Sequence, residues 1–251
     1  MIGFFDSGCG GLTVLKAVRA AIPSADVLYF GDTKNAPYGS RSRDELTRLT
    51  VEALKLLQDR GATSIVSACN SVSASLAISL FDSFSLQPTH LIEMVGPTVS
   101  AFRGSQERLL LVATPATIQS DIYQSAFRMI GHEVTCVAIP TLAGAIERGE
   151  GARELGHDIR NALQAVDLSQ FDRLILACTH YPLVQSLFEK VVPMPVFDPA
   201  AAVADRVEHR LWPQEARNGH LQFLISEDSD VFRHWVAKLF PDTQYEVEIL
   251  S

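Results

Sequence analysis

The sequence predicts an α/β fold with mainly parallel sheets, built from two similar halves. Short apolar runs alternate along the chain with segments of helix length, which is the pattern of parallel strands joined by crossover helices. Two of the runs end in a cysteine followed at once by polar residues, "SIVSACNSVSA" (64–74) and "LILACTHYPLV" (174–184). Cys69 and Cys178 are separated by nearly half the chain length, so we expect an approximate duplication that gives each half one thiol.

Eight apolar, β-prone runs are the predicted strands. Their bounds in chain order are 2–5, 27–30, 63–68, 90–95, 108–114, 133–139, 173–178 and 221–226. Because ligands of such folds bind beyond the carboxyl ends of the strands, we expect the functional residues in the loops that follow these runs.

The clearest predicted helix spans residues 42–60. Ser42 and Glu45 form the sequence pattern of a capping box, and Gly61 is a typical end signal. Apolar residues repeat between them at helical spacing, at Leu46, Leu49, Ala53 and Leu56. The segment therefore predicts an amphipathic helix that covers one face of a sheet.

The composition favours a soluble protein and argues against nucleic-acid binding. The 251 residues are 47% hydrophobic, yet no apolar run reaches the roughly 18 residues of a membrane helix. The net charge of -8 and the pI of about 5.3 argue against a general surface for nucleic acid. The N-terminal "MIGFFDSGCGG" has no basic segment, so it predicts a first strand instead of a signal peptide, and we expect a cytoplasmic protein.

The chain has four cysteines, and none of them lies in a C-x-x-C pattern. Disulfides are not expected in a cytoplasmic chain of this size. Cys9 and Cys136 are predicted to be ordinary buried residues. The turn "SGCGG" (7–11) indicates an anion-binding turn for a carboxylate, and Asp6 before it is a candidate N-cap for a helix over 11–22.

A cysteine at the end of a strand and the start of a helix is expected to have a lowered pKa, because the helix field favours the thiolate. Such a thiolate can act as a nucleophile or as a general base. Two of them favour racemisation, in which one thiolate removes the Cα proton and the opposite thiol delivers a proton to the other face. None of the five lysines lies in a motif-like stretch at a strand end, as a Schiff base to pyridoxal phosphate would need, so we expect neither a cofactor nor a metal.

Five motifs in a fixed order point to a known family. They are "FDSGCGGLTVL" (5–15), "YFGDTKNAPYG" (29–39), "ACNSVSA" (68–74), "ATPATIQSDIY" (113–123) and "LACTHYPLV" (176–184), and together they resemble the glutamate racemases of the aspartate/glutamate racemase superfamily. The resemblance implies two domains facing each other across a substrate cleft, residues 1–96 plus 208–251 with Cys69 and residues 97–207 with Cys178. It also implies a homodimer that interconverts L- and D-glutamate without a cofactor, supplying D-glutamate for peptidoglycan.

The resemblance assigns site residues by motif match. The acid/base thiols are Cys69 and Cys178, and their assistants are Asp6 beside the first thiol, His180 beside the second, and Glu147 as a further acidic group. The substrate contacts are Asp6, Ser7, Pro37, Tyr38, Gly39, Asn70, Ser71, Thr114, Thr117, Thr179 and His180. Hydroxyls, an amide and backbone N–H groups can hold carboxylates without a cationic site that would keep both thiols ionised.

Some positions depart from the family pattern and leave alternatives open. Ser71 stands where the family usually has Thr, Ala177 where Gly is common, and Cys9 where an aliphatic residue is common. These changes keep both thiols but affect the prediction of which substrate side chain the site prefers. The alternatives are a racemase of aspartate or another acidic amino acid, and a regulatory protein that keeps the fold, such as a DNA gyrase inhibitor.

Overall fold

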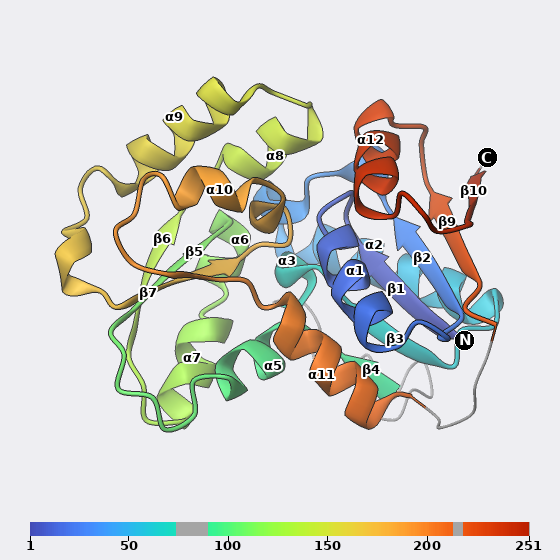
Figure 1. The fold of residues 1–251 in the computed structure, drawn as a ribbon, viewed down its shortest axis with the longest axis horizontal. Coiled ribbons are helices and arrows are strands. Elements are labelled where there is room, and N and C mark those ends of the chain that lie inside the picture. Colours follow the sequence, from blue (N-terminus) through green and yellow to red (C-terminus); the bar gives the residue numbers. More distant parts are fainter. Residues whose placement is uncertain (74–89, 213–217, 251) are drawn as a thin grey trace.

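The computed structural model describes residues 1–73, 90–212 and 218–250, in which strands and helices alternate (Figure 1). The strands form one six-stranded and one four-stranded sheet, and every strand pair is parallel. The predicted α/β class with parallel sheets is therefore confirmed. Ala74, the last residue of the motif at 68–74, lies outside the described residues. Among the described helices, none is both long and apolar enough to cross a membrane.

The six-stranded sheet joins the two ends of the chain. Its strand order is β10-β9-β2-β1-β3-β4, so β9 from the C-terminal part pairs with β2. The strands are β1 (Ile2–Asp6), β2 (Val27–Gly31), β3 (Ser64–Ser67), β4 (Leu91–Ile92), β9 (Leu221–Ile225) and β10 (Glu246–Ile249). The helices of this half are α1 (Leu12–Ala21), α2 (Arg43–Asp59), α3 (Asn70–Ser73) and α12 (Asp230–Leu239), with 3-10 turns η1 (Thr33–Asn35) and η2 (Tyr38–Ser40).

The four-stranded sheet forms the other half of the molecule, in the strand order β6-β5-β7-β8. Its strands are β5 (Leu109–Ala113), β6 (Val134–Ala138), β7 (Arg173–Ala177) and β8 (Val196–Phe197). The helices are α5 (Val95–Ser100), α6 (Pro115–Gln119), α7 (Ile122–Met129), α8 (Leu142–Glu147), α9 (Ala152–Leu163), α10 (Gln185–Phe188) and α11 (Ala200–Arg210), with 3-10 turns η4 (Leu168–Gln170) and η5 (Tyr181–Val184). Helix α11 packs against α1 and so connects the two halves (Figure 1).

The two halves share a strand order. The first contains β2-β1-β3-β4 and the second β6-β5-β7-β8, so β1 and β5 occupy equivalent central places. In each half the chain leaves the central strand toward one edge and then crosses back to the other, which creates a crevice at the carboxyl ends of the central strands. The two similar α/β halves expected from the sequence are therefore present. The domain boundaries at 96/97 and 207/208 stay a prediction.

The central strands are buried on both faces, which explains their continuous apolar sequences. Every residue of β1, β2 and β5 is buried. Helices cover these sheets, and Figure 1 shows α3 between the two halves. A rigid packed frame of this kind can hold the loops at the strand ends in fixed positions.

Most predicted elements form, and the differences have local causes. Helix α2 begins with the expected capping box, in which Ser42 and Glu45 bond each other's backbone N–H, and Gly61 follows it at φ 88°. The run predicted as a strand over 90–95 is a strand only at Leu91–Ile92. It stops because the Glu93 carboxylate accepts the N–H groups of Val95 (2.5 Å) and Gly96 (2.7 Å), which starts helix α5. Strands β8 and β10 were not predicted.

The Asp6 capping hypothesis is wrong. The N-cap residue of α1 is Gly11, without a side-chain cap. Asp6 bonds instead within the preceding turn and across to the other half of the molecule, as described below.

Candidate active site

The two strand-end thiols meet at one pocket. Cys69 follows β3 and Cys178 follows β7, and both are buried. The open space between their loops is about 10 Å³, room for about one water molecule. Its lining residues are Ser7, Pro37, Tyr38, Gly39, Cys69, Asn70, Ser71, Thr114, Ala143, Cys178, Thr179 and His180.

This lining contains the predicted site residues with three exceptions. Asp6, Glu147 and Thr117 do not line the pocket but hydrogen-bond residues that do, namely Thr179, His180 and Thr114. Ala143 of helix α8 lines the pocket and was not predicted. The motifs that follow β1, β3, β5 and β7 are thus brought together although they are far apart in the sequence.

Cys69 is shielded from solvent. Its sulfur is 3.8 Å from Ser7 Oγ. Burial and, second, the nearby Asp6 carboxylate raise the pKa of the Cys69 thiol to about 12. The lowered pKa expected at a helix start is therefore wrong for this thiol, because the loss of solvent and the Asp6 charge outweigh the groups that favour the thiolate.

Cys178 has a histidine partner that is itself held by a carboxylate. Its sulfur lies 3.8 Å from His180 Nδ1, and His180 Nε2 lies 2.5 Å from Glu147 Oε1. Burial lowers the pKa of His180, but hydrogen bonds with Cys178, Cys9 and Glu147 outweigh it and raise that pKa well above its ordinary value. Burial likewise opposes ionisation of Glu147, yet His180 brings its pKa below the usual range. This pair therefore presents an imidazolium ring to the Cys178 sulfur.

Asp6 connects the two halves of the site. Its Oδ1 accepts the Gly8 N–H at 2.9 Å, and its Oδ2 accepts the Thr179 hydroxyl at 3.0 Å. Because Asp6 ends β1 and Thr179 follows Cys178, this bond joins the loops of the two sheets. Burial raises the pKa of the Asp6 carboxyl.

The turn "SGCGG" fits so closely that side chains have no room at any of its three glycines, and a Cβ on Gly11 would lie 2.6 Å from Asp6 Cβ. A Cβ on Gly8 would lie 1.9 Å from Glu147 Oε1, and one on Gly10 would lie 2.7 Å from Thr179 Oγ1. The turn does bind carboxylates, but they belong to the protein: Gly8 N–H donates to Asp6 and Cys9 N–H donates to Glu147 at 2.8 Å. It thus positions the assisting acids.

One wall of the pocket carries a chain of hydroxyls and an oriented amide. Ser71 Oγ lies 3.0 Å from Thr114 Oγ1, which lies 3.1 Å from Thr117 Oγ1. The Tyr123 hydroxyl donates to Asn70 Oδ1 at 2.5 Å. The amide nitrogen of Asn70 is buried and has no hydrogen-bond partner among the described residues. A buried unpaired donor is costly, so it indicates a ligand acceptor at this point.

Two positioning residues were missed by the sequence analysis. Tyr123 orients Asn70, and Asp32 is buried and fixes Tyr38. Asp32 Oδ2 accepts the Tyr38 hydroxyl at 2.5 Å, and Asp32 Oδ1 accepts the Ser226 hydroxyl at 2.7 Å. Both residues lie inside the quoted motifs, at 29–39 and 113–123, but their roles depend on contacts that only the folded chain creates.

Comparison with known proteins identifies the family. Residues 12–207 match the Asp/Glu/Hydantoin racemase family. The chain belongs to this racemase family. Similar family members include the glutamate racemase of Aquifex aeolicus (strain VF5), which is 34% identical over an alignment that covers 100% of this chain and 97% of that protein.

Solved structures of racemases share the fold. The glutamate racemase of Francisella tularensis, crystallised in complex with D-glutamate, is 27% identical with a TM-score of 0.87, covering 100% of this chain and 97% of that one. A glutamate racemase isoform from Bacillus anthracis is also 27% identical, with a TM-score of 0.88 and the same coverage. The racemase family and its two-domain architecture thus extend over the whole chain.

Proposed function

We propose that this racemase-family protein interconverts L- and D-glutamate by a two-base reaction that needs no cofactor. The observation that carries the proposal is the meeting of Cys69 and Cys178, each with its own proton partners, at one buried pocket. The full-length similarity to glutamate racemases supports glutamate as the substrate.

In the proposed reaction each thiol serves one face of the Cα atom. The thiolate of one cysteine accepts the Cα proton, leaving a carbanion, and the thiol of the other cysteine donates its proton to the opposite face. One S–H bond forms and one breaks, so the two cysteines exchange protonation states in each turnover. The reverse reaction starts from the exchanged state.

The pocket wall supplies neutral groups for the substrate carboxylates. The unpaired Asn70 amide and the hydroxyls of Ser71, Thr114 and Thr179 face or adjoin the space between the thiols. Neutral donors hold an anion without stabilising both thiolates at once, so one cysteine can remain protonated to act as the acid.

The assisting residues differ between the two sides. His180, held by Glu147, faces the Cys178 sulfur and can hydrogen-bond it as it gives up or takes its proton. On the other side the Asp6 carboxyl lies behind Ser7 and Cys69, where it influences the Cys69 thiol through its charge. The two steps of the reaction therefore depend on different side chains.

Substrate entry requires the pocket to widen. An open volume of about 10 Å³ is far below what an amino acid occupies, and the wall comes from both halves of the molecule. Separation of the loops after β3 and β7 opens this space, and their return excludes water from the carbanion.

The substrate assignment is tested by incubating the protein with L-glutamate in D2O. We expect D-glutamate to form and deuterium to appear at Cα, followed by proton nuclear magnetic resonance and chiral chromatography. A parallel panel with aspartate and other amino acids tests side-chain preference. No turnover of glutamate, or turnover of aspartate alone, would retire the assignment.

The two-base reaction predicts the behaviour of the single variants Cys69→Ser and Cys178→Ser. Each should lower kcat by about 10²- to 10⁴-fold, the usual effect of losing a positioned acid or base. Residual Cα exchange should favour opposite enantiomers in the two variants. Cys136→Ser, which changes a half-buried cysteine outside the pocket, serves as the control. Equal residual racemisation in both active-site variants would contradict two bases.

The cellular setting is part of the same proposal. The resemblance to glutamate racemases supports a cytoplasmic homodimer that provides D-glutamate for peptidoglycan. Light scattering coupled to gel filtration tests the dimer, and restoration of growth in a bacterium that requires external D-glutamate tests the supply. A monomer at working concentration would reject the homodimer. Failure of an active enzyme to restore growth would reject the supply of D-glutamate for peptidoglycan.

A further inference from the structure

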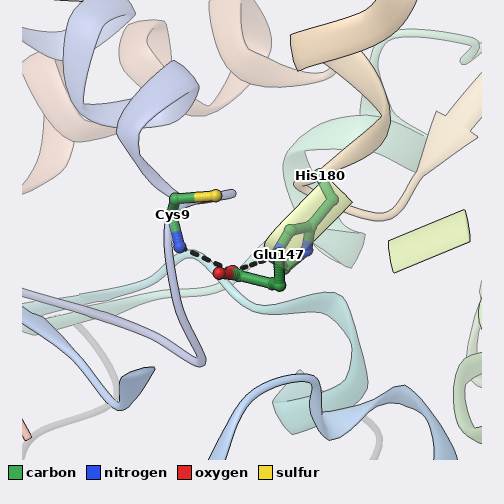
Figure 2. A group of neighbouring side chains, drawn as sticks. All are labelled: Cys9, Glu147 and His180. Atoms are coloured by element: carbon green, nitrogen blue, oxygen red, sulfur yellow. Dashed lines mark hydrogen bonds and ion pairs between the residues drawn. The ribbon is translucent and has the colours of Figure 1, made fainter. Parts of the chain in front are cut away.

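Cys9 lies against two of the proposed assisting residues without a part in the two-thiol reaction. It comes from the turn after β1, Glu147 from the end of α8 and His180 from the loop after β7 (Figure 2). One ligand atom from each, a sulfur, a carboxylate oxygen and a ring nitrogen, lies within 4.8 Å of the others. Cys9 and His180 are buried, and the Glu147 side chain is 10% exposed.

These three groups form a ligand set for a borderline-soft cation. Thiolate, imidazole and carboxylate all bind Zn²⁺, at about 2.3 Å for sulfur and about 2.0–2.2 Å for nitrogen and oxygen. Ligand atoms of a tetrahedral site therefore lie roughly 3–4 Å apart. The present separations require only small side-chain movements, chiefly of Glu147 away from its 2.5 Å contact with His180 Nε2.

Glu147 also faces an outer pocket through which a cation can approach. This pocket has a volume of about 330 Å³, and its lining includes Glu147, Glu227 and Asp228. The lining arginine, Arg148, is paired with Glu150 at 2.6 Å, which reduces its repulsion of a cation. Asp228 is likewise paired, with Arg233 at 2.7 Å, so Glu147 and Glu227 are the lining carboxylates that raise the local concentration of cations.

We propose that Cys9, Glu147 and His180 form an inhibitory binding site for Zn²⁺ or a cation of similar softness. Binding displaces the proton between His180 and Glu147 and the Cys9 thiol proton to the solvent. It holds His180 on the metal and takes Glu147 out of its pair with the ring. The cation thereby blocks the step assisted at Cys178. Metal binding stands independently of the reaction catalysed, whereas the inhibition rests on the proposed racemase function.

The metal site is tested without reference to activity by titrating the intact protein with Co²⁺ and with Zn²⁺. We expect one tight site, a sulfur-to-cobalt charge-transfer band, and displacement of Co²⁺ by Zn²⁺ in calorimetry. Cys9→Val, which places an aliphatic residue at this buried position, should lose the band and weaken Zn²⁺ binding at least tenfold. Cys9→Ser tests the same ligand with less change of shape, and circular dichroism establishes that both variants are folded.

Matched cysteine variants separate this site from the active-site thiols. Cys136→Ser should keep the band and the Zn²⁺ affinity. A band that survives in Cys9→Val but disappears in Cys69→Ser would overturn the proposal, as would the absence of binding to the unaltered protein. In the racemase assay, micromolar Zn²⁺ should inhibit, a chelator should restore the rate, and Cys9→Val should resist inhibition at least tenfold relative to its own metal-free rate. If Zn²⁺ binds but does not inhibit, the proposed inhibition is rejected and the metal site stands. If the metal-free protein does not racemise glutamate, the proposed function is rejected instead.

Discussion

At the scale of single residues, the site works by giving each thiol a different neighbour. Cys69 is near a hydroxyl and a buried carboxyl, whereas Cys178 faces a histidine held by Glu147. The proposed reaction is symmetric, but its two proton donors, Cys69 and Cys178, have different surroundings. The chemistry of each cysteine is set less by its own helix start than by residues brought from other loops.

Asn70 gives the sharpest residue-scale prediction. Its amide nitrogen is a buried donor without a partner among the described residues, while Tyr123 holds its oxygen at 2.5 Å. Asn70→Ala should lower kcat/KM for glutamate by about 10- to 100-fold, because a substrate carboxylate loses a buried hydrogen bond worth about 1–3 kcal/mol. Tyr123→Phe keeps the Asn70 amide but removes the hydrogen bond that orients it, so we expect a smaller loss of kcat/KM. Steady-state kinetics that give both variants unaltered constants would remove Asn70 from the binding site.

At the scale of elements, the turn between β1 and α1 determines where the assisting acids lie. Its N–H groups bind Asp6 and Glu147, and Gly8 leaves space for the second carboxylate. The turn was interpreted from the sequence as an anion-binding turn, but that pattern could not say that the anions come from the same chain. That fact depends on α8 reaching the turn from the other half.

Gly8→Ala tests this turn. The new Cβ would lie 1.9 Å from Glu147 Oε1, so Glu147 must move away from His180. Misplacement of a positioning group by about 1 Å can lower the rate on the order of 10²-fold, and we expect a loss of kcat of this size with secondary structure retained. Gly156→Ala in α9 is the control, since its Cβ would meet the flexible end of Arg160 at 3.2 Å and should raise the free energy of unfolding by about 0.5–1 kcal/mol. Equal kinetics for Gly8→Ala and the unaltered protein would show that the contact is dispensable.

The elements also indicate what a single sequence can predict. Continuous apolar runs such as β1 and β5 were recognised, because burial on both faces leaves a strong signal. Strand β8 has two residues and β10 reads "EVEI", so neither carries enough apolar sequence. The loops after the strands were predicted as the site from motifs. The bonds of Asp32 to Ser226 and of Tyr123 to Asn70 were not, because a hydrogen bond between distant segments has no local pattern.

At the scale of the whole molecule, the site exists only where the two halves meet. Asp6 bonds Thr179, Cys9 bonds Glu147, and Ser71 lies against Thr114, each pair joining one half to the other. Either half alone would supply only part of the residues that line the pocket. The same contacts close the space to about 10 Å³, so binding and separation of the halves are expected to be coupled.

Burial of thiols at this junction predicts how global stability depends on pH. Burial first, and then the Asp6 charge, raise the Cys69 pKa to about 12, whereas a cysteine in the unfolded chain ionises near pH 8.5. The folded state therefore holds this proton more tightly. The resulting stabilisation is fully present below about pH 8.5 and is lost as the pH rises toward 12, at about 1.4 kcal/mol per pH unit for this group.

Denaturant unfolding between about pH 9 and 11 measures this slope. Cys69→Ser removes one such group, so its free energy of unfolding should fall less steeply with pH than that of the unaltered protein, by about 1.4 kcal/mol per pH unit. The difference between the two slopes should vanish below about pH 8, where the cysteine is protonated in both the folded and the unfolded state. Parallel curves over the alkaline range would mean that the Cys69 thiol ionises in the folded protein as readily as in the unfolded chain. The pocket would then be far better solvated than its buried position between the two sheets implies.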